Sequence, residues 1–479
     1  MKRLLAIAVT GTMLGGCISS PSTIPRATQL KAETLGLGQA AAPQIADNWW
    51  KAFGDPQLDT LVDKALQGSP TLAAALARVR LAQSQLASSR AATYPQATLD
   101  AQETRLRFSK NYEIPPPYAG TTQWVGTAAA NLSWSLDLFG KEQALIDKLR
   151  ASAEAEALDA TAARLMLAGT VTEAYIQLSR AYRLADVAEE AARQREGVFK
   201  LTKLRVDSGL ESPAAQKQAE ALLAVAREDL TRAVANREIA AHQIAALIGR
   251  GADSYDIARP KLNPEAIALP QTLPADLLAR RADIAAAKAR VDAEVSGREA
   301  AHQAFYPDID LLGTAGWAAL GLSPMFSGSA LQYGAGPAID LPIFDAGKRR
   351  ADYAGATARL DEAVADYNQT IVVAVKQTAD ALTELRTIQD QTNDQRQALA
   401  AAEESFRMAQ ERYRSGLSPQ LNVLSAEDLV IQARRQSAAL DADIAAARVS
   451  LLMAIGGGFD AAQTYSSRQT SENQGPNNE

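Results

Sequence analysis

The sequence RVDSGL at residues 205–210 returns as RYRSGL at residues 412–417, 207 positions further along the chain. The same shift aligns the whole segment 140–249 with 347–456 without a gap. Self-similarity over such a long stretch is the signature of a structure built by repetition. The sequence therefore predicts two copies of one structural unit.

Each copy has the same predicted order of elements. A helix ends at a Tyr-Pro pair, because proline disfavours helix in the residue before it. Two strand-like segments around a Gly/Pro-rich loop follow, and then a very long helix, a Ser-Gly break and a final helix. The predicted boundaries are 49–258 for the first copy (helices 70–93, 140–207 and 213–248, strands about 97–108 and 121–138), 259–275 for a linker, and 276–458 for the second copy (helices 276–305, 347–414 and 419–455, strands about 308–320 and 331–342).

The long helices need partners along their whole length. Helix 347–414 would extend roughly 100 Å at 1.5 Å per residue, and an isolated helix is not stable in water. Its apolar residues recur at steps of three, four or seven, which is typical of coiled-coil packing. These residues are Leu360, Val364, Tyr367, Ile371, Val375, Leu382 and Leu385.

The strand segments alternate between apolar and polar residues. This pattern is typical of strands in a membrane barrel, although a half-buried sheet in a soluble domain alternates as well. Segment 97–108 is less regular, because Glu103 shares a face with Leu99 and Ala101, so its register stays open. Four strands cannot close a barrel, for which about eight are needed, and lipid does not tolerate open edges. If the strands span a membrane, several chains must share one barrel, and three chains would supply twelve strands.

The amino terminus predicts export and lipidation. Lys2 and Arg3 precede a short apolar run, which is shorter than the roughly 20 residues that span a bilayer. The run ends in LGGC at residues 14–17, which resembles the bacterial lipoprotein box. Residues 1–16 are thus a predicted signal peptide, Cys17 the lipidated residue, and 17–48 a lipid-anchored extended segment. Ile18 in place of aspartate favours the outer membrane by the usual sorting rule.

Composition excludes several other classes of protein. The single cysteine cannot form an intrachain disulfide, and the two histidines show no metal-ligand spacing. The net charge of −6 comes without a basic block, so we expect no nucleic-acid partner. No nucleotide-binding loop or nucleophile triad is visible. We expect no metal and no cofactor apart from the covalent lipid on Cys17, and we predict that the tail 459–479 is disordered.

Several motifs carry a resemblance to a known family. They are WWKAFGDPQL at 49–58, LPADLLARR at 273–281, FYP at 305–307, LPIFDAG at 341–347 and RYRSG at 412–416. In this order the chain resembles the bacterial outer membrane factors of the TolC, OprM and NodT type, closest to the NodT-like efflux lipoproteins. Ala282 stands where the family commonly has proline.

The resemblance implies an architecture and partners. Members are α+β membrane proteins that form trimers, with a shared twelve-stranded β-barrel in the outer membrane and an α-helical tunnel in the periplasm. The tunnel meets a periplasmic adaptor protein and an inner-membrane transporter of the RND class. The adaptor would dock at the periplasmic tip turns, which correspond here to Ser208, Gly209, Ser415 and Gly416.

The resemblance also points to a tunnel gate. TolC-like members carry inward-facing acidic residues just after the second tip turn. Asn422 and Ser425 stand at those positions here, and Asp428 is a candidate replacement one turn later. A solvated helix face is the alternative interpretation of Glu427 and Asp428. A neutral entrance would weaken any preference for cations.

The function expected from these features is a passive exit channel of a tripartite efflux pump. The alternatives are the outer-membrane duct of a specialised secretion system and a periplasmic coiled-coil scaffold held only by its lipid. We do not expect an enzyme.

Overall fold

The computed structural model describes residues 23–31, 34–37, 45–111, 114–251, 256–263, 269, 272, 276–321 and 323–459. The predicted signal peptide, Cys17 and the tail beyond Phe459 lie outside this range, whereas Phe459 itself is buried. The chain forms two compact units. The first comprises Met1–Gln29, Arg78–Glu156 and Ala287–Tyr367, and the second Leu30–Ala77, Ala157–Ala286 and Asn368–Glu479.

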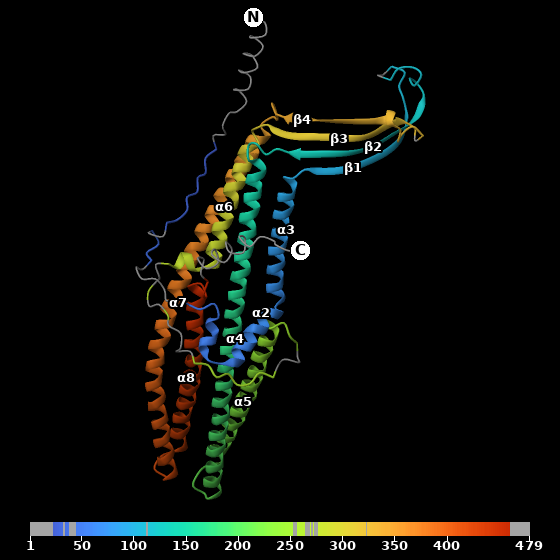
Figure 1. Cartoon of the computed structure of the whole chain (residues 1–479). Coiled ribbons are helices and arrows are strands. Elements are labelled where there is room, and N and C mark those ends of the chain that lie inside the picture. The colour runs from blue at the N-terminus through green and yellow to red at the C-terminus, as the bar shows by residue number, and fades with distance from the viewer. Residues whose placement is uncertain are drawn as a thin grey trace. The chain divides into compact units, whose positions relative to one another are not determined.

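The helices follow the predicted repeat (Figure 1). Helices α4 and α7 have 67 residues each, and helices α5 and α8 have 35 each, and the 207-residue shift maps both ends of each helix onto its counterpart. No helix in the described ranges is both long and apolar enough to cross a membrane. The helices are η2 (Trp49–Phe53), α2 (Pro56–Gly68), α3 (Pro70–Ala92), α4 (Lys141–Asp207), α5 (Pro213–Leu247), η5 (Leu277–Arg280), α6 (Ala282–Gln303), η6 (Gly328–Ala330), α7 (Lys348–Arg414) and α8 (Gln420–Ala454).

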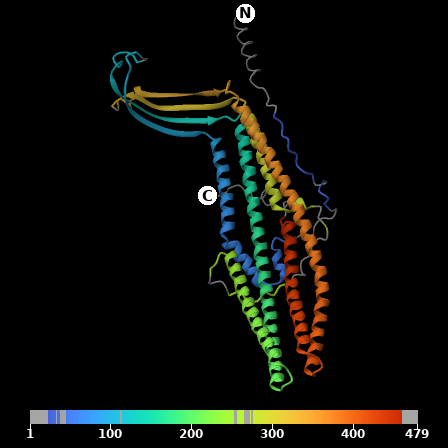
Figure 2. The ribbon, with the colours of Figure 1, turned by 180° about the vertical axis from the view of Figure 1, so that it is seen from behind.

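The first unit contains an antiparallel sheet in the order β1-β2-β3-β4, which Figure 2 shows from behind. Its strands are β1 (Gln96–Arg107), β2 (Thr122–Ser135), β3 (Asp308–Leu320) and β4 (Leu331–Asp340). Alternate residues of a strand point to opposite faces, so the register determines which side chains share a face. The face that we call the apolar face carries Ala97, Leu99, Ala101, Glu103, Arg105, Arg107, Thr122, Trp124, Gly126, Ala128, Ala130, Leu132, Trp134, Ile309, Leu311, Gly313, Ala315, Trp317, Ala319, Leu331, Tyr333, Ala335, Pro337 and Ile339.

The register of β1, which the sequence left open, is now defined. Ala97 pairs with Leu132 and Glu103 pairs with Gly126, so Glu103 does share the apolar face. The opposite, polar face carries Asp100, Asp308, Asp310 and Asp340 and no basic residue within the four strands.

Two predicted boundaries are wrong. The helix predicted at 276–305 is split, because η5 ends at Arg280, Arg281 is extended with φ −116° and ψ 123°, and α6 begins only at Ala282. The strand predicted at 121–138 ends at Ser135, because Asp137 turns to accept a hydrogen bond from Gln143 N, at 2.8 Å, in the first turn of α4.

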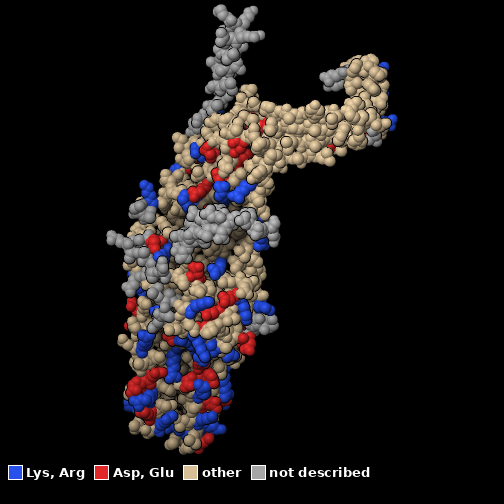
Figure 3. Space-filling view, viewed as in Figure 1, with Lys and Arg blue, Asp and Glu red and all other residues tan. Residues whose placement is uncertain are grey.

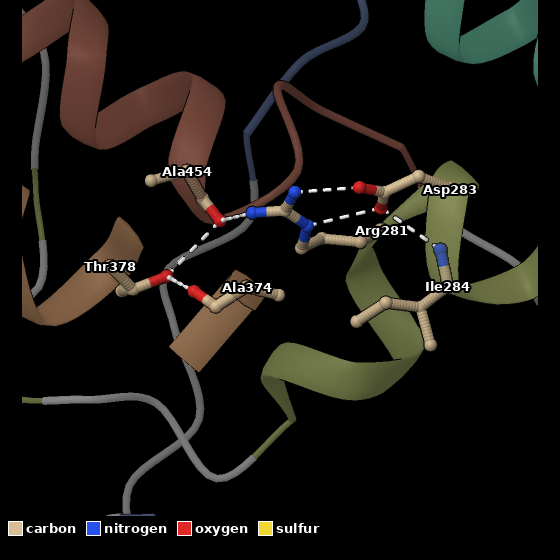
Figure 4. A network of polar contacts seen from close by, with 6 residues as sticks. All are labelled: Arg281, Asp283, Ile284, Ala374, Thr378 and Ala454. Carbon is tan, nitrogen blue, oxygen red and sulfur yellow. Dashed lines mark hydrogen bonds and ion pairs between the residues drawn. The ribbon is translucent and has the colours of Figure 1, made fainter. Parts of the chain in front are cut away.

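Figure 4 shows why the chain is extended at Arg281. Its guanidinium donates to both carboxylate oxygens of Asp283, at 3.0 and 2.6 Å, and to the Ala454 carbonyl at the end of α8, at 2.8 Å. The Thr378 hydroxyl of α7 lies 3.1 Å from the same carbonyl. The buried Arg281 and Thr378 thereby both donate to a terminal carbonyl of α8. The network is formed with Ala282 as the first residue of α6.

The core of the second unit includes the WWKAFGDPQL motif. Trp49, Trp50 and Phe53 are buried in one cluster with Tyr175 of α4. Asp55 accepts hydrogen bonds from the Tyr175 hydroxyl, Gln57 N and Lys261 N, at 2.7, 3.0 and 2.7 Å. The Asp55 carboxylate therefore caps the N-terminus of α2 and also binds the segment that joins the two repeats.

Before the first repeat, residues 23–31 form neither helix nor strand, and the chain turns at residues 34–36. In the first unit the backbone N–H groups of Arg26 and Ala27 both donate to Asp361 of α7, at 2.8 and 2.9 Å. Ala27 also packs against the cluster of Val291, Leu360 and Val364. The Asp361 carboxylate thus accepts the hydrogen bonds of these two backbone N–H groups in place of a backbone carbonyl, and it holds the segment against α7.

Candidate functional site: the tips of the helical hairpins

The predicted tip turns have the same geometry in both repeats. Gly209 and Gly416 adopt φ +73° and +75°, the left-handed region that favours glycine. The next amide, of Leu210 or Leu417, donates to a carbonyl five residues earlier, at 2.8 Å in each case. Each long helix thereby ends in a Schellman motif, which lets the chain reverse into the following helix.

Apolar side chains are exposed around these turns. Leu417 is 72% exposed, and Leu204, Leu210 and Leu421 are similarly exposed. Single exposed leucines need no explanation, but several on two adjacent turns form an apolar surface of the kind that contacts another protein.

The two hairpins are joined just behind the tips, within the second unit. The Arg205 guanidinium lies 4.7 Å from the ring centre of the buried Tyr413 and donates to the Tyr413 carbonyl at 3.3 Å. The buried Gln420 amide donates to the Thr202 hydroxyl at 2.8 Å. These contacts connect α4 to α7 and α8, and no local pattern in the sequence predicts them.

The three candidate gate residues share one exposed face of α8. Asn422, Ser425 and Asp428 follow one another at steps of three residues, and all three are exposed. The residues between them, Val423 and Leu424, are buried in a cluster with Val198 and Tyr413. The structure thus brings the candidates together, but Asp428 is not a free acid, because it forms an ion pair with Arg195 of α4.

Glu427 corrects the expectation of a solvated face. Its side chain is fully buried, and one of its carboxylate oxygens lies 2.8 Å from Nη1 of the buried Arg195. The approach lacks hydrogen-bond geometry, so neither oxygen has a hydrogen-bond donor among the residues that the structure describes. Burial raises the pKa of Glu427 to about 7, although the Arg195 charge acts in the opposite direction. The signal was present in the sequence, since Glu427 is in step with the apolar Val423, Leu424, Val430 and Ile431.

Further along the same helices lies a polar hollow of about 360 Å³. It touches all four long helices, and Glu173, Gln177, Gln243 and Glu384 are among its lining residues. Partial desolvation raises the pKa of Glu173. Where the structure describes the chain, no three His, Cys, Asp or Glu residues are grouped closely enough to hold a metal ion.

A comparison with known protein families shows to which family the chain belongs. The sequence profile described as "Outer membrane efflux protein" matches residues 61–250 and 273–457, one match in each repeat. The chain belongs to the outer membrane efflux protein family.

Individual relatives of this efflux protein agree with that assignment. The fusaric acid resistance protein FusA of Burkholderia cepacia is 36% identical over 74% of this chain and 69% of its own. The multidrug resistance outer membrane protein MdtQ of Escherichia coli is 29% identical over 93% and 96%. Among solved structures, the outer membrane protein VceC of Vibrio cholerae superposes with a TM-score of 0.81 at 31% identity, covering 87% of this chain and all of that one.

These comparisons confirm the predicted fold class, family and outer-membrane location of the efflux protein. The relatives are outer-membrane channels, which is a class of transport protein and not of enzyme. The roles predicted for Cys17, the tip turns and the gate residues stay predictions, because no comparison addresses single residues.

Proposed function

We propose that three copies of this efflux protein form one passive exit channel that conducts small molecules from the periplasm to the exterior. The observation that carries the proposal is the sheet, whose apolar face has no charge except at one end, while β1 and β4 each have a single neighbour among the described strands. Such edges require further strands in lipid, and the edges of other copies can supply them.

The polar face of the sheet would line the passage. Its aspartates would make a surface that water and polar solutes can wet. The channel has no chemistry to perform in this proposal, so it acts as a conduit and not as an enzyme. Energy would come from an inner-membrane RND transporter, to which an adaptor protein would connect the channel.

The adaptor would dock at the tip turns. The exposed leucines around Gly209 and Gly416 support this role, because both turns present the same apolar residue after the glycine. Lipid on Cys17 would add a second anchor to the outer membrane.

The competing scaffold function differs in how the protein is held. A scaffold depends on its lipid alone, whereas membrane-spanning strands hold the protein independently. We expect a Cys17→Ala variant, exported with a cleavable signal peptide that does not require lipidation, to remain in the outer-membrane fraction after washing with carbonate. Recovery of this variant in the soluble periplasmic fraction would contradict the channel and support the scaffold.

A further inference from the structure

Charged side chains on the apolar face occur only near its loop end, where β1 leads into the loop before β2. Arg105 pairs with Trp124 and Arg107 pairs with Thr122, the first residue of β2. Glu103 lies one step further in, opposite Gly126. In Figure 3 the sheet is almost free of charge, and basic atoms appear at this end. The charge on this face is therefore confined to one rim.

Neither arginine has a carboxylate partner among the residues that the structure describes. The Arg105 guanidinium instead lies 5.8 Å from the ring centre of Trp124. Many arginines of the helices, by contrast, form ion pairs, such as Arg193 and Arg407. An arginine over an aromatic ring keeps its hydrogen-bond donors directed outward and available to a ligand.

The loop after β3 brings further apolar side chains to the same end of the sheet, where the Gly321 amide donates to the Trp124 carbonyl at 2.7 Å. Phe326, in the loop after β3, is 70% exposed and meets the Trp317 ring edge-on at 5.7 Å between ring centres. The neighbouring Met325 folds onto the apolar face over Gly126, where an added Cβ would lie 3.0 Å from its sulfur. This loop therefore extends the apolar face at the same rim as the arginines.

The position of the rim matches the edge of a membrane. Trp134 follows Trp124 by ten positions on β2, which corresponds to about 33 Å along the strand. A strand tilted by about 40° would span about 25 Å of the bilayer thickness over this length. That height equals the apolar band of membrane strands, which aromatic residues border on both sides. Arg105 then lies at the level of the lipid headgroups, and Arg107 lies further out.

We propose that Arg105, Arg107 and Trp124, together the rim patch, bind the phosphate groups of lipid headgroups in the outer leaflet. The inference rests on the proposed function, because it requires the apolar face to meet lipid. Guanidinium groups bind phosphate oxygens through two parallel hydrogen bonds, and the aromatic rings occupy the boundary between headgroup and acyl chain. The lone acid, Glu103, is placed toward the apolar band and leaves the outer side basic.

The test uses the full-length protein in phosphatidylethanolamine vesicles that contain a small fraction of labelled lipid A with two phosphates. The amount of labelled lipid that stays bound after mild detergent extraction is measured for each protein. Parallel vesicles contain the same lipid without phosphates, and a further sample receives inorganic phosphate as competitor. The variant is Arg105→Gln with Arg107→Gln, and the matched control is Arg78→Gln with Arg80→Gln on α3, which has the same spacing and the same loss of charge.

We expect the double variant in β1 to retain about tenfold less phosphorylated lipid than the natural protein, since each basic residue near an anionic lipid contributes to binding. The control on α3 should retain as much as the natural protein, the lipid without phosphates should bind weakly to all, and inorganic phosphate should not displace the bound lipid. Equal retention by both double variants would overturn the rim patch.

Membrane insertion is measured in the same samples by flotation of the vesicles. Proteins that float but bind both lipids equally contradict only the rim patch. Proteins that do not float at all contradict the proposed channel as well.

Discussion

Glu427 is a carboxylic acid with no exposed surface, buried between α4 and α8 close to the predicted entrance. The groups that face it are Arg195 from α4 and Asp428 from its own helix. On α7, the Glu403 carboxylate forms an ion pair with Arg434 of α8. The desolvation of the Glu427 carboxylate outweighs the attraction of the Arg195 charge, which is why the pKa of Glu427 is raised.

This environment predicts a pH dependence of stability. The pKa of Glu427 is about 7 in the folded chain against 4.5 for an ordinary glutamate, so the folded state binds the proton more tightly. Its contribution to stability is fully present below about pH 4.5 and is lost as the pH rises through about 7. A difference of about 2.5 pKa units corresponds to roughly 3 kcal/mol. We expect the thermal midpoint of the helical signal to fall between pH 5 and pH 8 by more in the natural protein than in Glu427→Gln.

The repeat provides the control for this prediction. Glu220 is the counterpart of Glu427 in the first copy, but it is exposed and pairs with Lys217. Glu220→Gln should therefore have the same pH profile as the natural protein. Identical profiles for Glu427→Gln and Glu220→Gln would show that the buried carboxyl does not titrate in this range.

At the scale of elements, the turns at the hairpin tips depend on glycine. Gly209 and Gly416 have positive φ, and a Cβ at either position would meet no atom within 4 Å. Any cost of a side chain there comes from the backbone alone. Gly197, in the interior of α4, has equally open surroundings but a helical backbone.

Replacement of glycine by alanine should therefore have opposite effects on the stability of the protein at Gly416 and at Gly197. Gly416→Ala should destabilise the protein by about 1 kcal/mol, because alanine pays to enter the left-handed region. Gly197→Ala should stabilise it by about 0.5–1 kcal/mol, because glycine weakens a helix interior. The midpoints of denaturant unfolding measure both. A Gly416→Ala variant as stable as the natural protein would mean that the turn can end the helix in another way.

The elements were largely predictable because they are periodic and repeated. The 207-residue shift predicted the long helices to within a residue or two at each end, and the apolar residues predicted to pack along α7, from Leu360 to Leu385, are buried or partly buried. The errors occur where a contact between residues distant in sequence determines the local structure. The hydrogen bond of Arg281 to the end of α8 breaks a helix that local propensity favours, and pairing with β2 fixes the register of β1.

The candidate site was predictable only in part. The tip turns were recognised from Ser-Gly, since glycine after a helix has a local meaning. The links of Arg205 to Tyr413 and of Arg195 to Glu427 join residues more than 200 positions apart, and one sequence does not show which charge meets which.

At the scale of the whole molecule, each repeat supplies one hairpin of strands and one hairpin of long helices. The strands present an apolar face that a soluble domain would have to cover, and the helices carry a polar hollow and end in exposed apolar turns. A protein with these three surfaces is suited to connect a membrane with partners in the periplasm. The channel proposal accounts for all three surfaces.

The most direct measurement is the accumulation of a fluorescent efflux substrate in cells depleted of this protein. We expect accumulation to rise on depletion and to fall again when the natural protein is restored, because the exit route is lost and regained. A variant with Leu210→Asp and Leu417→Asp should reach the outer membrane but fail to restore efflux. Unchanged accumulation across a broad panel of drugs and dyes would contradict a general efflux channel and favour a specialised secretion duct or a scaffold.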